Sequence, residues 1–453
     1  MIKNVPRIMF TAPNSSSGKT TVTCAVLQAL INQQFCPTAF KSGPDYIDPM
    51  FHSKILGTKS RNLDLFLLGA DTCRQLLAKN AAGSDIAILE GAMGYYDGIG
   101  TTDCGSAYEL AKETATPVIL VLNAKGAALS AAAMIKGFCD FRKDSNIQGV
   151  ILNNINPMTY HYYKETIETE TGIKLLGYLP QMKDCSFESR HLGLVTAEEI
   201  KDLQNIVTSL AQQAAKSIDL EGLRKIAEQA KPLSYEEQKV SKIADVKIAI
   251  AQDKAFCFYY QDALELLEDL GAKLVPFSPL NDKAVPSCDG IILGGGYPEV
   301  YAGELASNTE MLRSIKTLLK ENKPCLAECG GFMYLLERYI DATGSSFTWV
   351  GALAGEVSMT KSLQRFGYVT LTAKHDNLLA TCGESINAHE FHYSDSTANG
   401  NSYLACKASL KGQWECINAT ATLYAGYPHI HLCGNSEFAK NFVKACAEKR
   451  TNS

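Results

Sequence analysis

The stretch that decides the fold of the first half of the chain is RIMFTAPNSSSGKTTVTCAVLQAL, residues 7–30. RIMFTA is typical of a buried strand, and a helix is expected from about residue 20, after the Gly-Lys-Thr turn. In this strand–loop–helix context, backbone N–H groups at the helix N-terminus cradle phosphates. Lys19 would reach the outer phosphates of ATP, and the Thr20 hydroxyl can bind Mg²⁺. The alternative is an ordinary serine turn before a helix, which this context disfavours.

Five further short apolar runs in the first half alternate with amphipathic stretches, at residues 38–41, 85–90, 117–124, 148–155 and 175–180. Continuous apolar strands separated by helices predict an α/β fold with a parallel sheet covered on both faces. Ligands of such sheets gather at the carboxyl ends of the strands. The phosphate-binding turn lies at one of these ends, so other polar residues that follow strands are expected beside it.

Four carboxylates follow strands in this half. Asp45 and Asp48 lie in KSGPDYIDP, Glu90 ends a strand, and Asp97 follows it in EGAMGYYDG. A buried acid is costly without a cation, and Mg²⁺ is commonly bound by one or two carboxylates together with phosphates. The alternative is that Asp48 and Asp97 are loop acids that cap helices.

The pattern changes between residues 198 and 244, where one or two surface helices and the polar run KPLSYEEQKVSK predict a linker. A second α/β domain is expected over residues 245–453, which leaves 1–197 as the first domain. LAECGGFMYLL (326–336) reads as a strand, a sharp turn at Cys329 and a helix. A cysteine at such an elbow is exposed, and the helix N-terminus favours its thiolate.

The surroundings of Cys329 suggest the rest of a nucleophilic site. The N–H of Gly330 can donate to an oxyanion, and the glycine turn at Gly295 offers a second donor. The candidate bases are His429 and His431 in YAGYPHIHLCGN, with His389 and His392 in HEFHYS. Residues two apart on a strand share a face, so spacing does not choose between His429 and His431.

Composition excludes several classes of protein. The 453 residues predict two or three domains, and 46% apolar with 20% charged residues is typical of a globular protein. A net charge of -5 without a basic block argues against nucleic acid as a partner, and no apolar run is long enough for a membrane span. Fifteen scattered cysteines without Cys-x-x-Cys, and no signal peptide, predict reduced thiols in the cytoplasm.

The first-half motifs PNSSSGKTT, FKSGPDYIDPMFH, RNLDLF, LEGAMGYYDG and RHLGL resemble, in order and spacing, those of the cobyrinic acid a,c-diamide synthases. These belong to the dethiobiotin-synthetase-like group of P-loop amidoligases. The resemblance implies that ATP is a co-substrate bound by Ser17, Gly18, Lys19, Thr20 and Thr21. It implies Mg²⁺ at Thr20, Asp45 and Glu90, and an acceptor-carboxylate site at Asp48 and Asp97. The usual first glycines are replaced, with Pro13 and Ser16 in their places.

The second half resembles a class I glutamine amidotransferase domain of the cobyric-acid type. The resemblance implies that Cys329 attacks glutamine and that the base is His429, which matches the histidine of the family's Y-x-H. The usual glutamate two residues later is replaced by His431, so a Cys–His dyad is predicted. HEFHYS (389–394) and RFGY (365–368) also match the diamide synthases, without a role that we can assign.

Together these features predict a cytoplasmic ligase. ATP would convert an acid to an acyl phosphate, and ammonia from glutamine would displace the phosphate. The implied acceptor is cobyrinic acid, amidated at its a and c acetates, so the expected partners are small molecules. There are two alternatives. One is the similar family of Ni-sirohydrochlorin a,c-diamide synthases, which also act on a tetrapyrrole. The other is a P-loop scaffold ATPase without amide synthesis. A homodimer is left open.

Overall fold

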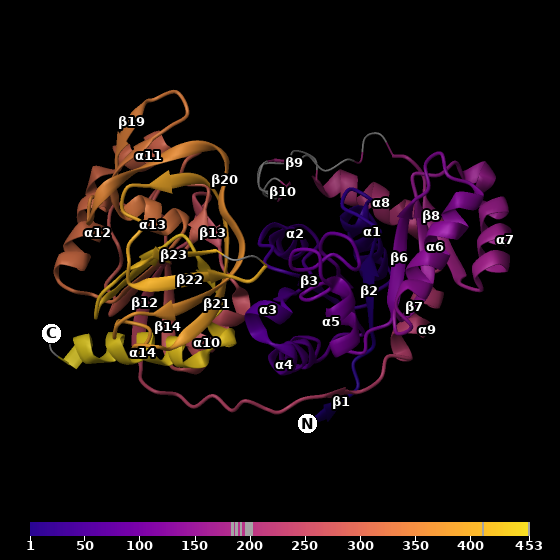
Figure 1. The fold of residues 1–453 in the computed structure, drawn as a ribbon, viewed down its shortest axis with the longest axis horizontal. Coiled ribbons are helices and arrows are strands. Elements are labelled where there is room, and N and C mark those ends of the chain that lie inside the picture. The colour runs from indigo at the N-terminus through magenta and orange to yellow at the C-terminus, as the bar shows by residue number, and fades with distance from the viewer. Residues whose placement is uncertain (183–184, 186–188, 191–192, 195–202, 410–411, 452–453) are drawn as a thin grey trace. The chain divides into compact units, whose positions relative to one another are not determined.

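The computed structural model describes residues 1–182, 185, 189–190, 193–194, 203–409 and 412–451. The chain forms two compact units, unit 1 over Met1–Glu237 and unit 2 over Gln238–Ser453 (Figure 1). The segment expected to be a linker divides at this boundary. Its helices α8 (Leu203–Ser217) and α9 (Leu220–Glu228) bury apolar side chains in the core of unit 1, and the polar run after them leads into unit 2.

Unit 1 is built on a seven-stranded sheet in the order β4-β3-β5-β2-β6-β7-β8, and every neighbouring pair is parallel. Its strands are β2 (Arg7–Thr11), β3 (Pro37–Ser42), β4 (Ser60–Leu63), β5 (Ile86–Glu90), β6 (Val118–Asn123), β7 (Ile147–Asn153) and β8 (Lys174–Leu179). All positions of β2, β3 and β5 are buried, as expected for a sheet covered on both faces. The predicted α/β class is confirmed, and β4 is an added edge strand.

Helices connect and cover these strands (Figure 1). They are α1 (Lys19–Asn32), α2 (Ile47–Ile55), α3 (Leu65–Leu68), α4 (Ala70–Asn80), α5 (Ala107–Glu113), α6 (Leu129–Phe141), α7 (Tyr160–Thr171), α8 and α9, with the 3-10 turn η1 (Pro157–Thr159). Helix α1 shares one apolar core with α8, α9 and the sheet. Two short pairs complete the unit, β1 (Ile2–Lys3) with β11 (Leu233–Ser234) and β9 (Ser189–Arg190) with β10 (Gly193–Leu194).

A buried arginine ties the start of β2 to distant parts of unit 1. The Arg7 side chain is fully buried, and its guanidinium donates hydrogen bonds to the carbonyls of Thr114 (2.6 Å), Lys231 (2.7 Å) and Val5 (2.8 Å). Burial lowers the pKa of Arg7 to about 10, which leaves it charged at neutral pH. The Arg7 guanidinium thus supplies hydrogen-bond donors to backbone carbonyls within the fold.

Unit 2 contains two larger sheets. The first has the order β14-β12-β15-β17-β25-β24, and all its pairs are parallel except β24–β25. Its strands are β12 (Val246–Ala251), β14 (Ala272–Phe277), β15 (Gly290–Leu293), β17 (Cys325–Glu328), β24 (Asn418–Ala419) and β25 (Leu423–Gly426). The second is mixed, with β18 (Leu336–Ile340), β19 (Ser346–Thr348), β20 (Leu353–Ala373), β21 (Ser385–Ser396), β22 (Tyr403–Lys407), β23 (Gln413–Cys416) and β26 (His429–Ile430).

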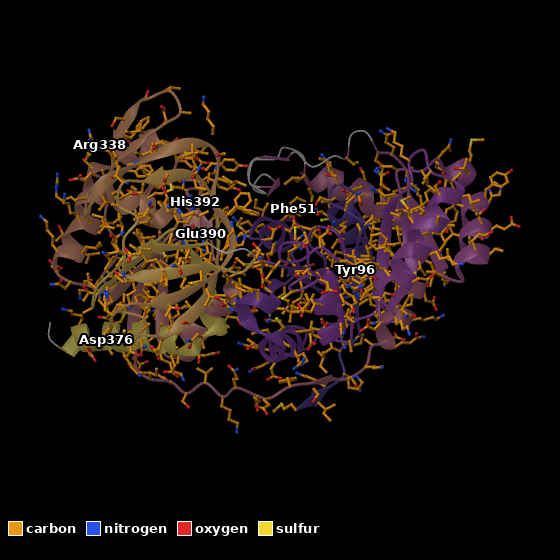
Figure 2. The ribbon with its side chains drawn as sticks, in the orientation of Figure 1. Phe51, Tyr96, Arg338, Asp376, Glu390 and His392 are labelled. Atoms are coloured by element: carbon orange, nitrogen blue, oxygen red, sulfur yellow. The ribbon has the colours of Figure 1, made fainter. Side chains whose placement is uncertain are left out.

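The helices of unit 2 are α10 (Gln261–Asp269), α11 (Ala302–Ser307), α12 (Thr309–Lys320), α13 (Gly330–Leu335) and α14 (Ser436–Thr451), with a 3-10 turn η2 (Leu432–Gly434). A short pair of β13 (Phe256–Phe258) and β16 (Gly295–Gly296) lies beside them. Figure 2 labels Glu390 and His392, which are buried in this unit, and Arg338 and Asp376, which are exposed. Among the described residues, no helix is long and apolar enough to cross a membrane.

Candidate active sites

The turn between β2 and α1 is a close-fitting loop that a glycine makes possible. Gly18 has φ 93° and caps α1, and Ser16 also has positive φ. A Cβ on Gly18 would lie 1.9 Å from Nδ2 of Asn153, which donates to the Ser17 carbonyl at 3.0 Å. Asn153 at the end of β7 thus holds the loop that the sequence predicted, and Thr21 follows in the first turn of α1.

The Lys19 ammonium is placed where it could bind an anion. Its ammonium donates to the carbonyls of Asn14 (3.2 Å) and Met93 (2.5 Å) and is mostly buried. Burial, and then the charge of Lys41, lower the pKa of Lys19 to about 8. A phosphate would form stronger, charge-assisted hydrogen bonds than the two neutral carbonyls do.

A buried cluster of charges adjoins this loop. Thr20 donates to Glu90 Oε1 at 2.6 Å, and Lys41 Nζ lies 2.8 Å from the same oxygen and 2.5 Å from Asp48 Oδ2. Burial opposes the charge of Lys41, but Asp48 and Glu90 outweigh it and raise the pKa of Lys41. Two acids therefore share one lysine inside the fold.

The two acids respond differently to this environment. Burial raises the pKa of Asp48 to about 8 against the opposing charge of Lys41. Burial also favours the neutral form of Glu90, but Lys41 and then His52 outweigh it and lower the pKa of Glu90. Glu90 is therefore an anion of the cluster, and the charge of Lys41, 2.5 Å from Asp48 Oδ2, offsets part of the effect of burial on Asp48.

The cluster suits a Mg²⁺ ion that is bound together with phosphates. Glu90 Oε2 is buried without a hydrogen-bond partner in the described part of the chain, and His52 Nε2 lies 3.8 Å from it. Among the described residues, no group of three or more His, Cys, Asp or Glu side chains is arranged to hold a metal. Thr20 and Glu90 could therefore supply two ligands, and phosphate and water oxygens the others.

The other two predicted carboxylates have local roles in the structure. Asp45 Oδ1 accepts from the N–H groups of Ile47 (2.8 Å) and Asp48 (3.1 Å) at the start of α2. Asp97 Oδ2 accepts from the Gly94 N–H at 3.1 Å, and the charge of Asp97 acts on Lys19. A hydrogen bond joins Thr20 to Glu90, whereas the hydrogen bonds of Asp45 given above go to backbone N–H groups of α2.

Sequence reasoning did not single out Lys41, His52 or Asn153. Lys41 and Asn153 are polar residues at the ends of otherwise apolar strands, which was the available signal. His52 is fully buried, and burial lowers its pKa to about 4, so it is neutral at physiological pH.

In unit 2, Cys329 stands alone at the elbow between β17 and α13. Its φ of 45° and ψ of −105° are unusual for a residue with a side chain, and such strain is typical of a nucleophile elbow. Gly331 lets the helix approach the sheet closely, because it has no Cβ. A Cβ at this position would lie only 2.0 Å from the Leu293 carbonyl oxygen. Cys329 is buried, with 9% of its surface exposed, so the expectation of an exposed cysteine at this elbow is wrong: the side chain lies among the buried residues of the unit 2 core.

The structure brings His429 to this cysteine. Burial disfavours the charged imidazole, but the interaction with Cys329 and then that with Glu328 outweigh burial and raise the pKa of His429 to about 10. A Cβ on Gly295 would lie 2.5 Å from His429 Cε1, and one on Gly330 would lie 2.9 Å from Pro298 Cδ. The two predicted oxyanion glycines thus border the Cys–His pair.

His431 has a different environment. Strand β26 ends at Ile430, so the two-residue period does not extend to His431. His431 Nδ1 accepts from the Cys433 N–H at 3.3 Å, and its ring stacks on Tyr260 at 4.5 Å between centroids. Burial lowers the pKa of His431 to about 3, so it is a neutral cap of η2.

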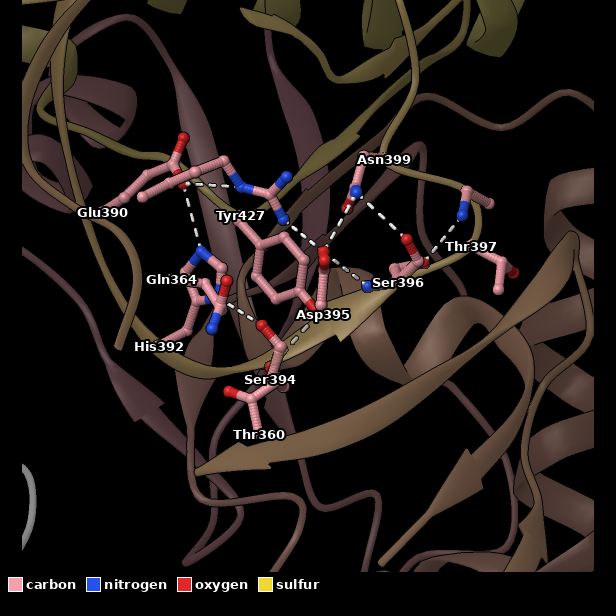
Figure 3. Close-up of polar contacts among 12 residues, drawn as sticks. Thr360, Gln364, Glu390, His392, Ser394, Asp395, Ser396, Thr397, Asn399 and Tyr427 are labelled. Carbon is pink, nitrogen blue, oxygen red and sulfur yellow. Dashed lines mark hydrogen bonds and ion pairs between the residues drawn. The ribbon is translucent and has the colours of Figure 1, made fainter. Parts of the chain in front are cut away.

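The motifs RFGY and HEFHYS form a polar network on β20 and β21 (Figure 3). Buried Glu390 lies 3.1 Å from His392 Nε2, and Arg365 Nε lies 3.7 Å from the same carboxylate oxygen. The His392 ring stacks on Tyr427 at 3.7 Å, and Ser394 donates to the Tyr427 hydroxyl at 3.1 Å. Burial, and then the charge of Cys329, raise the pKa of Tyr427, which places the network beside the nucleophile.

None of the fifteen cysteines is in a disulfide. The exposed ones are Cys36, Cys104, Cys382 and Cys406. Burial raises the pKa of the Cys139 thiol to about 11. The RHLGL motif (190–194) includes His191 and Leu192, which lie outside the described residues.

A phosphate-binding loop at one parallel sheet and a Cys–His elbow at another define a nucleotide-binding enzyme that carries a glutamine amidotransferase domain. Comparison with known families agrees. Residues 8–195 match the CobQ/CobB/MinD/ParA nucleotide binding domain, and residues 247–437 match the CobB/CobQ-like glutamine amidotransferase domain.

The chain belongs to the cobyrinate a,c-diamide synthase family. Proteins with that name are 40% identical in Caldanaerobacter subterraneus (97% of this chain and 98% of the relative) and 38% identical in Thermoplasma volcanium (98% and 97%). One from Fusobacterium nucleatum is 41% identical over 95% of this chain and 98% of its own length. The resemblance inferred from the motifs is confirmed.

Proposed function

We propose that the protein uses ATP and glutamine to amidate the a and c acetate carboxylates of cobyrinic acid. The observation that carries the proposal is the presence of two complementary sites in one chain: a phosphate-binding loop with a buried acid cluster, and a cysteine elbow with its own histidine. The names of the similar proteins support the choice of acceptor.

In unit 2, the Cys329 thiolate attacks the amide carbon of glutamine to form a tetrahedral intermediate. The N–H groups near Gly330 and Gly295 stabilise its oxyanion. The C–N bond breaks as the His429 imidazolium gives a proton to the leaving ammonia, which leaves a glutamyl thioester on Cys329. Water, deprotonated by His429, then hydrolyses the thioester to glutamate and restores the thiol.

In unit 1, Lys19 and the N–H groups of the Ser17–Thr21 loop hold the phosphates of ATP. An oxygen of the acceptor carboxylate attacks the γ-phosphorus, ADP leaves, and an acyl phosphate forms. Ammonia adds to the acyl carbon, the C–O bond to phosphate breaks, and the products are an amide and inorganic phosphate. Lys19 is positioned to neutralise charge that moves onto the departing ADP.

We propose that Thr20 and Glu90 bind Mg²⁺, with Asp45 nearby, and that Asp48 and Asp97 line the acceptor site. The buried, unpartnered Glu90 Oε2 supports the metal site. Mg²⁺ would neutralise phosphate charge during the transfer. Because Lys41 lies 2.5 Å from Asp48 Oδ2 and offsets its charge, an acceptor carboxylate can approach Asp48 with less repulsion than an unpaired aspartate would cause.

The runner-up acceptor is Ni-sirohydrochlorin, which also carries adjacent acetates. Mass spectrometry of the products from each acceptor, supplied separately with ATP and glutamine, distinguishes the two. A gain of two amides on cobyrinic acid is expected. A scaffold ATPase without amide synthesis would leave the glutamine amidotransferase domain unexplained.

We further propose a cytoplasmic location and a homodimer. Fifteen cysteines with no disulfide among them suit a reducing compartment. Leu129 (61% exposed) and Phe141 (59% exposed) on α6 present apolar surface that self-association could cover. Sedimentation velocity of the purified protein tests the dimer.

The decisive experiment is Cys329→Ala with two nitrogen sources. Glutamine-dependent synthesis should fall about 10⁴-fold or more, because the nucleophile is lost, while synthesis from added ammonia persists. The matched control is Cys325→Ala, a buried cysteine at the start of β17, four residues before the elbow, that makes no proposed covalent bond. Equal loss of both activities in Cys329→Ala alone would contradict the division of labour.

A further inference from the structure

We infer that Glu328 is the residue that positions His429 for glutamine hydrolysis, so that the acid supporting the base is the residue immediately before the nucleophile. The inference rests on the proposed function of the Cys329 site. It supplies the third group that the dyad prediction left out.

The geometry carries the inference. Glu328 is the last residue of β17, and its side chain is 13% exposed. One carboxylate oxygen, Oε2, lies 3.7 Å from Nδ1 of His429, and the other, Oε1, accepts a hydrogen bond from the Ile430 N–H at 3.1 Å. The same carboxylate therefore contacts both the imidazole ring and the backbone of the strand that carries it.

The position two residues after the base holds no acid in this chain. His431 stands there, and it caps η2 and stacks on Tyr260, so its ring is engaged elsewhere. The carboxylate instead comes from the neighbouring element, β17.

Three charged or titratable groups lie close to His429 in the described part of the chain, and Glu328 is the carboxylate among them. They are Cys329 at the start of α13, Glu328 on β17, and His389, which is the cross-strand partner of His429 on β21. Burial and the charge of His429 lower the pKa of His389 to about 3, so His389 is neutral. Of these three groups, Glu328 is the only carboxylate, and it stays beside His429 while Cys329 is bound covalently to the substrate.

This arrangement has a chemical consequence. At 3.7 Å the Glu328 carboxylate acts on Nδ1 through its charge and not through a hydrogen bond; that charge favours the tautomer in which Nδ1 carries a proton and leaves Nε2 for exchange with the reacting atoms. It also stabilises the imidazolium, which must persist until it protonates the departing ammonia. Without the carboxylate, His429 would lose its proton at lower pH and rotate more freely.

The test compares Glu328→Gln with Glu328→Asp. The glutamine variant keeps an oxygen that can accept from the Ile430 N–H but removes the charge beside His429, whereas the aspartate variant keeps the charge. Glu321→Gln, at the exposed end of α12, is the matched control. The readouts are kcat/KM for glutamine hydrolysis against pH, ammonia-dependent synthesis, and the melting temperature.

For Glu328→Gln we expect kcat/KM to fall by about 10- to 100-fold, the range typical of removing a group that orients a reactive ligand. The alkaline limb of the pH profile should move to lower pH, since the imidazolium is less stable. Ammonia-dependent synthesis and the melting temperature should stay close to those of the wild type, and Glu328→Asp should restore most of the limb.

A wild-type pH profile and kcat/KM in Glu328→Gln would overturn the inference. So would a defect that Glu328→Asp shares in full with no return of the alkaline limb, because the role would then be one of shape rather than charge. Failure of the proposed function looks different: the wild type would show no glutamine hydrolysis, or Cys329→Ala would retain it.

Discussion

Both units place their chemistry where a parallel strand ends and a helix begins, yet the two turns are built differently. In unit 1, seven residues separate β2 from α1, and Gly18 with φ 93° lets the loop close around an anion. In unit 2, Cys329 alone separates β17 from α13 and takes a φ of 45° itself. The first turn can surround a ligand, whereas the second presents one side chain.

The difference extends to the surrounding charge. Lys19 and the helix N–H groups offer positive charge that awaits a ligand, with Glu90 poised for a cation. Cys329 is accompanied by two protein groups, His429 and Glu328. Under the proposed function, the same strand–turn–helix geometry serves phosphate binding when the turn is long and nucleophilic attack when it is short.

The largest difference between the two turns is expected when Lys19, in the first turn, is substituted. Lys19→Ala should lower synthesis by at least about 10³-fold with either nitrogen source, because phosphate charge loses its main partner. Glu90→Gln should likewise fail with both sources and should lose its response to Mg²⁺. Lys164→Ala, on the exposed face of α7, is the control, and product formation is followed by mass spectrometry. Ammonia-dependent turnover by Glu90→Gln at the wild-type rate would show that the metal assignment is wrong.

The comparison is sharpened at the two histidines of the second turn. His429→Ala should lower glutamine hydrolysis by about 10²- to 10⁴-fold, as expected for the loss of a general acid–base. His431→Ala should lower it far less, since that ring caps η2 and is neutral. Glutamate release measures both, and a larger defect in His431→Ala would reverse the assignment.

A stability measurement asks whether the two units are independent. Arg7→Met should destabilise unit 1 by about 3 kcal/mol, because buried carbonyls lose their donor. Glutamine hydrolysis should then survive to a higher temperature than ammonia-dependent synthesis. Arg224→Met, a partly exposed substitution on α9, should have little effect. Parallel loss of both activities on heating Arg7→Met would argue that the units unfold together.

The smallest expected effect is on pH dependence. The pKa of His429 is raised from its ordinary value near 6.5 to about 10, so the stability from its charge is fully present below about pH 6.5 and is lost as pH rises through about 10. Cys329→Ala removes the largest cause of that shift. Melting temperatures of wild type and Cys329→Ala, measured from pH 7 to 10.5, should therefore converge at the alkaline end. A constant difference across the range would contradict this linkage.

Much of the fold was predictable because buried parallel strands have a direct signature. The six strands expected in the first half agree with observed strands to within about two residues, since each is a continuous apolar run. Strand β4 (SRNL) was missed because three of its four residues are polar. The long antiparallel pair β20–β21 also escaped prediction, because β20 has few buried positions in its first part and three buried positions of β21, Glu390, His392 and Ser394, are polar.

The site was predictable as far as local sequence reaches. The loop at Lys19 and the elbow at Cys329 are each encoded within about ten residues. Lys41, Asn153 and Glu328 act on residues that are distant in sequence or on another strand, and only the sheet order brings them together. A strand period could not separate His429 from His431, because the strand ends between them.

The distribution of free thiols has a practical consequence for the bench. Four cysteines are exposed, whereas the reactive one is recessed, so a general alkylating reagent would modify the surface before it reached position 329. An electrophile shaped like glutamine would instead react first at Cys329 and could be used to titrate the active sites. Air-oxidised preparations would cross-link through Cys36, Cys104, Cys382 or Cys406 while their chemistry remained intact, so aggregation on storage would be a poor guide to lost activity.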